Sequence, residues 1–221
     1  MATSRPCGGP RGSTGSKAVP DGGRPGEHPA PPADLATRSL PLLTTTQPWF
    51  RVYRVRHTPL YFGKSGDGRF DLPGKESGVL YVAADEACAF IETLGQATGT
   101  RVITISALRS RGVAEIHVQR PLRLVDLTGP GLAHLEADER LCAGDYTVAQ
   151  RWSLALFRHP QKPDGLCYRS RHDPGRLCAA IYQRVARKLP VVRQVGLGDR
   201  EAVWLLGTLQ RLYAFLIDDT Q

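Results

Sequence analysis

The segment GVLYVAADEACAFIETLG, residues 78–95, contains the most definite strand and helix signals of this chain. Residues 78–83 form a short apolar run bounded by turn formers, which is typical of a buried strand. Asp85 is a favourable N-cap residue, and Gly95 is the residue type that most often follows the end of a helix. The segment therefore predicts a buried strand that leads directly into a short helix ending at Leu94.

Further short elements surround this segment on both sides. Strand-like runs occur at residues 50–55, 101–106, 113–118, 122–127, 166–169, 177–182 and 191–195. Asp145 caps a predicted helix that Pro160 ends, and Asp199 caps a predicted final helix over residues 200–217. Short strands of antiparallel type, mixed with helices and without regular βαβ alternation, are typical of the α+β class.

Glycine and proline are concentrated near the N-terminus. Residues 1–48 hold 7 of the 23 glycines and 9 of the 17 prolines of the 221-residue chain. This segment has few large apolar side chains to offset the entropy of ordering it, so we predict a disordered tail over residues 1–48. Residues 49–221 are expected to form one domain, in which the Gly- and Pro-rich segment 57–78 is a long loop.

Several classes of protein are excluded by what the sequence lacks. No stretch approaches the roughly 20 apolar residues that cross a bilayer, and the N-terminus lacks the apolar core of a secretory signal. Five widely separated cysteines without a CxxC pair, and histidines without a partner at metal-ligand spacing, predict free thiols in a reducing cytoplasm and no metal site. The net charge of +8 favours phosphates or nucleic acid as partners.

Common catalytic signatures are also missing. The chain contains no GxSxG, HExxH or P-loop motif, and no GxGxxG follows a strand. Six polar residues instead stand in apolar or glycine-rich surroundings: Arg51, Arg54, Arg69, Tyr81, Glu92 and Ser170. Each has an ordinary structural explanation by itself, as a solvated strand or helix position or as a core tyrosine. Their order along the chain is more informative than any one of them.

Five pieces of sequence in a fixed order resemble the RES domain family. They are FRVYR at residues 50–54, GRFD at 68–71, GVLY at 78–81 followed by Glu92, LRLVDLT at 122–128, and GLCYRS at 165–170. The resemblance covers residues 49–187. The family is named after arginine, glutamate and serine positions, and it is best known as the toxin half of RES–Xre toxin–antitoxin modules.

The resemblance implies an ADP-ribosyltransferase-like fold, in which a split antiparallel β core with flanking helices surrounds an NAD-binding cleft. It further implies a bacterial enzyme that cleaves the nicotinamide–ribose bond of NAD+ as a glycohydrolase or phosphorylase, with NAD+ as substrate and no other cofactor. A protein ADP-ribosyltransferase on the same fold is an alternative, because all these reactions share the first cleavage. A non-enzymatic basic module that binds nucleic acid is a second alternative, supported by the net charge.

Physical chemistry suggests a role for each matched residue. Glu92 suits the catalytic carboxylate, which would stabilise the oxocarbenium character that develops on the ribose. Tyr81 suits an aromatic ring that stacks on the nicotinamide. Arg51 and Arg69, with Arg54 as a third, suit the pyrophosphate, which binds forked cationic donors.

Two of these assignments face competitors. Arg51 and Arg54 compete for the family arginine, and Arg51 is favoured because it directly follows an aromatic pair. Glu86 is a second carboxylate near Glu92, but an acid in the first turn of a helix already has a structural reason.

The last matched position also has neighbours of similar chemistry. Ser170 would supply one orienting hydrogen bond near the ribose or a phosphate. Arg169, Arg171 and His172 are alternatives that could supply this contact with Ser170 or in its place. The expected partner is an Xre-like antitoxin that blocks the cleft, and we also expect that the chain can form a homodimer. Direct binding of nucleic acid is not expected, because the chain has no aromatic-basic motif or recognition helix.

Overall fold

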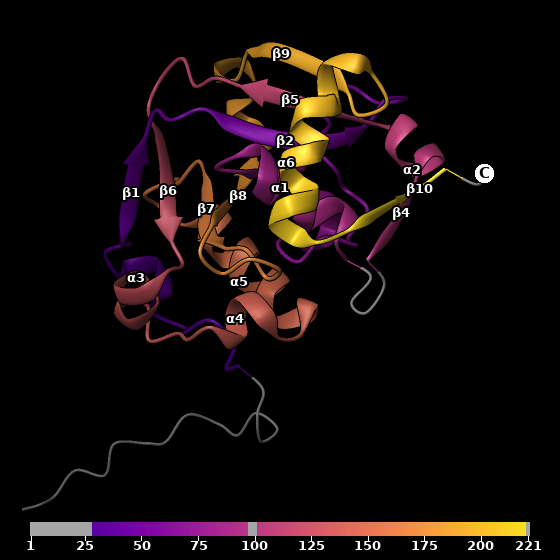
Figure 1. Ribbon diagram of the computed structural model, residues 1–221. Helices are drawn as coiled ribbons and strands as arrows, with labels where there is room; N and C mark the ends of the chain where they lie inside the picture. The colour runs from indigo at the N-terminus through magenta and orange to yellow at the C-terminus, as the bar shows by residue number, and fades with distance from the viewer. Residues whose placement is uncertain (1–27, 97–100, 220–221) are drawn as a thin grey trace, which may run out of the picture.

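The computed structural model describes residues 28–96 and 101–219 (Figure 1). The strands are β1 (Leu42–Thr45), β2 (Trp49–Arg54), β3 (Val79–Ala83), β4 (Val102–Thr104), β5 (Arg111–Ile116), β6 (Leu122–Asp126), β7 (Gly165–Arg169), β8 (Leu177–Tyr182), β9 (Val191–Gly196) and β10 (Leu216–Asp218). The α-helices are α1 (Glu86–Leu94), α2 (Ile105–Arg109), α3 (Gly129–His134), α4 (Arg140–Ala143), α5 (Tyr146–Arg158) and α6 (Val203–Tyr213). The 3-10 helices are η1 (Leu35–Thr37), η2 (Pro73–Lys75), η3 (Gln183–Lys188) and η4 (Arg200–Ala202).

Eight strands form one sheet in the order β1-β6-β7-β8-β3-β2-β5-β9. All neighbours in this sheet are antiparallel except β6 and β7, which are parallel. A separate parallel pair joins β10 to β4. Figure 1 shows α6 crossing in front of the sheet, with α3, α4 and α5 gathered at its lower end. The predicted α+β class and the mainly antiparallel core are therefore confirmed.

Alternate residues of the central strands enter different cores. In β8, Cys178 and Ala180 point toward the helices, whereas Ala179 and Ile181 point to the opposite face. On the helical side, one cluster lies under α3, α4 and α5, and another lies under α1, α2 and α6. On the opposite side, the sheet curls around its own cluster, which includes the fully buried Trp49.

The sheet is open between β2 and β3. Within the described residues, Phe50 and Ala83 form the only residue pair that joins these two strands, whereas β2 pairs with β5 along its whole length. At its N-terminal end, β3 instead forms an isolated bridge between Val79 and Gly63 of the preceding loop. This divergence corresponds to the split β core implied by the family resemblance.

The predicted strand and helix of residues 78–95 are confirmed as β3 and α1. Asp85 has extended backbone angles, and its Oδ1 accepts a hydrogen bond of 2.8 Å from the backbone N–H of Cys88. Gly95 follows the helix, and its N–H donates to the carbonyl of Ile91. Buried residues at the centre of α1, including Phe90, hold the helix against the sheet.

The structure does not show the predicted disorder over residues 28–48. Residues 28–48, which were assigned to a disordered tail, belong to the fold, while residues 1–27 lie outside the described part. β1 pairs with β6, and Leu35 and Leu40 are buried in the cluster beneath α5. The low apolar content was misleading because a few leucines suffice when the rest of the domain supplies a partner strand and a core.

Two other predicted elements differ in their bounds, and two short helices were not predicted. The predicted final helix over 200–217 begins as η4, continues as α6 and ends at Tyr213, because Ala214 adopts the left-handed conformation with φ 52° and ψ 40°. The last part of that segment belongs to β10. The predicted strand over 101–106 is the short β4 followed by α2. The short helices α3 and α4 were not predicted, because neither is long enough to show an apolar period.

Among the described helices, none has the length and apolar character needed to cross a membrane. Residues 28–96 and 101–219 contain no group of three or more His, Cys, Asp or Glu side chains that could hold a metal ion.

Candidate active site

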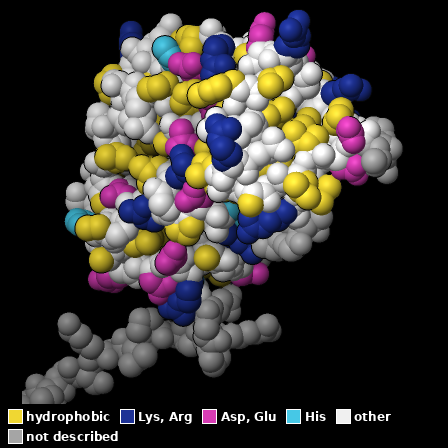
Figure 2. All heavy atoms as spheres, in the orientation of Figure 1, with side chains coloured by type: hydrophobic (Ala, Val, Ile, Leu, Met, Phe, Trp, Pro, Cys, Tyr) yellow, Lys and Arg dark blue, Asp and Glu magenta, His cyan; other side chains and the backbone are white. Residues whose placement is uncertain are grey.

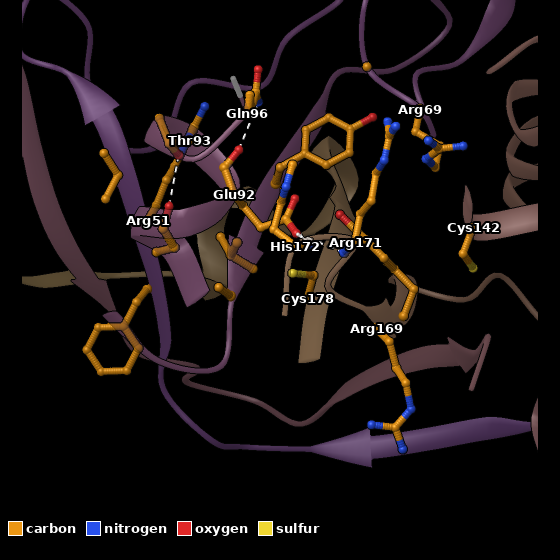
Figure 3. A pocket seen from close by; sticks show the side chains of 18 of the residues that line it. Arg51, Arg69, Glu92, Thr93, Gln96, Cys142, Arg169, Arg171, His172 and Cys178 are labelled. Carbon is orange, nitrogen blue, oxygen red and sulfur yellow. Dashed lines mark hydrogen bonds between the residues drawn. The ribbon is translucent and has the colours of Figure 1, made fainter. Parts of the chain in front are cut away.

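A cavity of about 590 Å³ opens where β2 and β3 diverge, between the two helical clusters (Figure 3). Its lining comes from β2, β3, α1, the loop before η2, α4, the start of α5, and the chain segments around β7 and β8. The charged, hydroxyl and amide side chains that line it are Arg51, Asp67, Arg69, Tyr81, Glu92, Thr93, Gln96, Tyr146, Tyr168, Arg169, Arg171 and His172. The structure thus brings together Arg51, Arg69, Tyr81 and Glu92, which are distant in sequence.

The loop that follows β7 holds the carboxylate of Glu92. Oε1 accepts hydrogen bonds from Ser170 Oγ at 2.5 Å, from the backbone N–H of Arg171 at 2.9 Å and from that of His172 at 3.4 Å. All side-chain hydrogen bonds that Glu92 forms with the described residues go to this one oxygen. Oε2 forms no hydrogen bond with the described residues, and the Glu92 side chain lines the cavity.

Ser170 lies behind Glu92 rather than in the cavity lining. The residue is only 2% exposed. While its hydroxyl donates to Glu92, the same oxygen accepts from the backbone N–H groups of His172 at 3.2 Å and Asp173 at 2.9 Å. The hydroxyl of Ser170 thus orients the Glu92 carboxylate, and its expected hydrogen bond near a ribose or phosphate stays a prediction.

A second layer of contacts connects this loop to two helices. Arg176 donates to Asp173 at 2.7 Å and to Asp85, the N-cap of α1, at 2.6 Å. Tyr213, at the end of α6, donates to the same Asp173 carboxylate at 3.0 Å. Although burial opposes it, the hydrogen bonds from Arg176 and Tyr213 lower the pKa of Asp173. These contacts tie the loop that holds Glu92 to the N-terminus of α1 and to the C-terminus of α6.

Tyr81 places its ring in the cavity wall and its hydroxyl in the glycine-rich loop. The hydroxyl donates to Asp71 Oδ1 and accepts from Phe70 N–H, both at 2.9 Å. The other oxygen of Asp71 accepts from the N–H groups of Gly66 and Gly68, both at 3.1 Å. Burial, followed by the neighbouring Asp71, raises the pKa of Tyr81 above its ordinary value, so the phenol stays protonated.

Steric crowding explains why residue 68 is a glycine. A Cβ atom there would collide with the hydroxyl of Tyr81 and with the carboxylate of Asp71. The loop therefore approaches Tyr81 more closely than any other residue type would permit. This close approach brings the following residue, Arg69, to the cavity.

Arg69 connects the glycine-rich loop to the helices below it. Its side chain is buried, one guanidinium nitrogen donates to the carbonyl of Gly144 at 2.7 Å, and the guanidinium carbon lies 4.4 Å from the centre of the Tyr146 ring. These contacts hold a positive charge at the cavity wall.

Of the two competing arginines, only Arg51 lines this cavity. One guanidinium nitrogen of Arg51 donates to the carbonyls of Pro59 at 2.7 Å and Tyr61 at 2.8 Å. Burial lowers the pKa of Arg51 to about 10, so the group remains charged at neutral pH. Arg54 is exposed and lies beside a second, adjoining cavity.

The cavity contains residues that the sequence did not single out. Tyr168 lines it, and burial raises the pKa of this residue. The one sequence signal for Tyr168 was its position within the GLCYRS piece. Cys142 and Cys178 also line it. Burial raises the pKa of Cys142 to about 12, so this thiol stays protonated at neutral pH. Its environment favours an apolar packing role over that of a nucleophile.

Fold and cavity together define a class of protein: a curled α+β domain whose split sheet holds a carboxylate, an aromatic ring and arginines at the opening. The RES domain family model matches residues 48–204 of this chain. The chain belongs to the RES domain family.

Two known proteins are similar to the chain. The "probable toxin y4kH" of Sinorhizobium fredii (strain NBRC 101917 / NGR234) is 32% identical over 94 residues, which are 42% of this chain and 73% of that protein. The crystal structure of the M. tuberculosis MbcT–MbcA toxin–antitoxin complex contains a chain with a TM-score of 0.57 and 17% identity, over 78% of this chain and 92% of that chain. At this identity the second likeness concerns the fold.

Proposed function

We propose that this chain is a toxin-like enzyme that cleaves the bond between nicotinamide and ribose in NAD+. The observation that carries the proposal is the carboxylate of Glu92, with one oxygen held by three donors and the other left open, in a cavity that also holds Tyr81, Arg51 and Arg69. Membership of the RES family and the name of the rhizobial relative support it.

In the proposed reaction the bond from ribose C1′ to the pyridinium nitrogen breaks, and both electrons remain on that nitrogen. Nicotinamide leaves as a neutral molecule, while positive charge develops on C1′ and the ribose ring oxygen. Glu92 stabilises this charge and accepts a hydrogen bond from the 2′-hydroxyl. Because Ser170 and two backbone N–H groups already hold the carboxylate, little reorganisation is needed as the charge develops.

The arginines are suited to the pyrophosphate of NAD+. Arg51 and Arg69 each use the Nη1 atom for their hydrogen bonds to described residues. The remaining N–H donors of both forks are then available for phosphate oxygens. The ring of Tyr81, whose hydroxyl is held by Asp71, offers a fixed surface on which nicotinamide can stack.

The group that accepts ADP-ribose defines the exact reaction. Attack by water gives a glycohydrolase, attack by inorganic phosphate gives a phosphorylase, and attack by a protein side chain gives an ADP-ribosyltransferase. We propose that water or inorganic phosphate is the acceptor, so that NAD+ is destroyed, and we keep transfer to a protein as the alternative. Incubation of a cell lysate with labelled NAD+ distinguishes the outcomes, because protein transfer leaves the label on discrete protein bands.

We further propose that an antitoxin protein binds this chain and blocks the cavity. The similar M. tuberculosis chain comes from a toxin–antitoxin complex, and the family resemblance indicates an antitoxin of the Xre-like type. Bacterial cytoplasm, where NAD+ is present, is the proposed place of action. Homodimer formation stays a prediction.

Binding of nucleic acid has less support. On the face shown in Figure 2, basic and acidic side chains are interspersed rather than gathered into one basic stripe. Retention on duplex DNA near 0.2 M salt, without NAD+ turnover, would favour this alternative.

Replacement of Glu92 tests the proposed function. Purified protein is incubated with NAD+, and nicotinamide release is measured by chromatography. We expect Glu92→Gln to lower the rate by about 10²- to 10³-fold, since the neutral amide cannot stabilise the developing charge. Glu86→Gln is the matched control, because Glu86 lies on the same helix but forms an ion pair with Arg193 outside the cavity.

Each part of the proposal has its own contradicting result. Equal rates for the wild type and Glu92→Gln would show that the site is wrong. A folded wild-type protein that releases no nicotinamide would contradict NAD+ cleavage itself.

A further inference from the structure

A second cavity, of about 370 Å³, adjoins the candidate active site along β2 and the end of α1. Arg51, Val52, Thr93 and Gln96 line both cavities. The other residues that line the second cavity are Tyr53, Arg54, His57, Thr58, Tyr61 and Arg111. We call this second cavity the arginine chamber.

Positive charge in the arginine chamber is not balanced by acids. Arg51, Arg54 and Arg111 line it, and among the described residues no Asp or Glu does. Arg54 and Arg111 are directly opposite each other on the antiparallel strands β2 and β5, an arrangement in which like charges repel. Burial, and then the positive charges of Arg54 and Arg56, lower the pKa of Arg111.

Five arginines elsewhere in the described structure are paired with acids. Ion pairs with Asp or Glu are formed by Arg38, Arg140, Arg158, Arg176 and Arg193. The side chain of Arg54, in contrast, forms no hydrogen bond or ion pair with the described residues. Arg111 donates to the hydroxyl of Ser110 at 3.0 Å, and Arg51 donates to backbone carbonyls. None of these neutral acceptors removes the repulsion.

The end of α1 does not provide sufficient compensation either. Thr93 and Gln96 bring the C-terminal end of this helix to the chamber. A helix C-terminus carries a partial charge equivalent to roughly half an elementary charge. Three guanidinium groups therefore leave a clear excess of positive charge, which an anion entering the chamber would neutralise.

We propose that the arginine chamber is a phosphate-binding site next to the active site. Arg54 and Arg111, which are paired on adjacent strands, supply forked cationic donors of the kind that bind phosphate oxygens. The stacked rings of His57 and Tyr61, whose centroids are 5.1 Å apart, line the same chamber. The phosphate is either free inorganic phosphate or a phosphate group of a dinucleotide that extends from the main cavity. The second source rests on the proposed function.

Binding of inorganic phosphate is measured first, by calorimetric titration without NAD+ and at low ionic strength. The variants are Arg54→Gln/Arg111→Gln and the control Arg120→Gln, which removes an exposed arginine beyond the other end of β5. We expect saturable binding to wild type and control, and at least about tenfold weaker binding to the double variant, because its charge-assisted hydrogen bonds are lost.

Binding of NAD+ and NADP+ is measured next with the same three proteins, at low temperature and short times. Weaker dinucleotide binding by the double variant alone, without binding of free phosphate, assigns the chamber to a phosphate of the dinucleotide. If the double variant matches the wild type for both inorganic phosphate and the dinucleotides, the proposal is overturned. If the wild-type protein binds inorganic phosphate but not NAD+, the phosphate site is supported and only the proposed function is contradicted.

Thermal melting provides the folding control. Since the double variant removes repulsion between like charges, we expect its melting temperature to equal or exceed that of the wild type. A clear decrease would show that these arginines stabilise the fold, and it would overturn the argument from unbalanced charge.

Discussion

Ser170 holds the candidate catalytic carboxylate without reaching the cavity itself. Its buried hydroxyl donates to Glu92 and accepts from the backbone of His172 and Asp173. A glutamate near the end of a helix ordinarily samples several rotamers, but rotation of Glu92 would break its three hydrogen bonds. The serine therefore acts as a positioning residue for the carboxylate.

Ser170→Ala tests this positioning role. We expect kcat for nicotinamide release to fall about tenfold or more while KM changes little, because the carboxylate is still present but less well fixed. Ser77→Ala is the control, since Ser77 is also buried and its hydroxyl bonds to a backbone carbonyl outside the cavity. Equal kcat losses in the two variants, or a rise in KM alone, would contradict the positioning role.

Among the structural elements, the loop before η2 and strand β3 are joined by one buried carboxylate. Asp71 is 3% exposed and accepts from Tyr81 and from two glycine N–H groups. The loop conformation and the position of the tyrosine ring consequently depend on the same side chain. Since this loop also carries Arg69, two of the proposed NAD-binding residues share one support.

A double-mutant cycle measures this support. Asp71→Asn and Tyr81→Phe each remove the bond between the two side chains, and each is expected to lower the free energy of unfolding, Asp71→Asn by about 1–3 kcal/mol. The double variant should lose less than the sum, by about 1 kcal/mol, because the shared bond is lost only once. Urea unfolding of the four proteins gives these values, and strictly additive losses would contradict the coupling.

Elements governed by local chemistry were predictable from the sequence. The helix cap at Asp85 and the stop at Gly95 depend on residues close together in the chain. β1 and the end of α6 were not predictable, because β1 exists by pairing with β6 and Ala214 ends the helix where β10 begins to pair with β4.

Across the whole molecule, the segment before β2 belongs to the core of the domain. The indole N–H of Trp152 donates to the carbonyl of Pro29 at 2.9 Å, and the N–H of Leu40 donates to Gln161 at 2.9 Å. β1 forms one edge of the eight-stranded sheet. The buried leucines of this segment complete the cluster under α5.

N-terminal deletions distinguish the corrected boundary from the predicted one. Removal of residues 1–27 leaves all these contacts in place, so melting temperature and nicotinamide release should match the full chain. Removal of residues 1–45 exposes the edge of β6 and empties two buried leucine positions, at about 2–5 kcal/mol for each large aliphatic side chain. We expect this shorter chain to melt at a much lower temperature or to remain unfolded. Equal melting temperatures would show that the first boundary was correct.

The sequence by itself determined the α+β class, the β3–α1 unit, and the order of arginine, tyrosine, glutamate and serine positions that indicates the RES family. These features depend on local propensity and on the order of residues, which a single sequence contains. Only the tertiary structure decided that Arg51 rather than Arg54 reaches the main cavity, that Ser170 bonds to Glu92, and that Arg54 is opposite Arg111. Those contacts arise where β2 diverges from β3 and where distant strands fall into register, and no local signal in the sequence specifies either event.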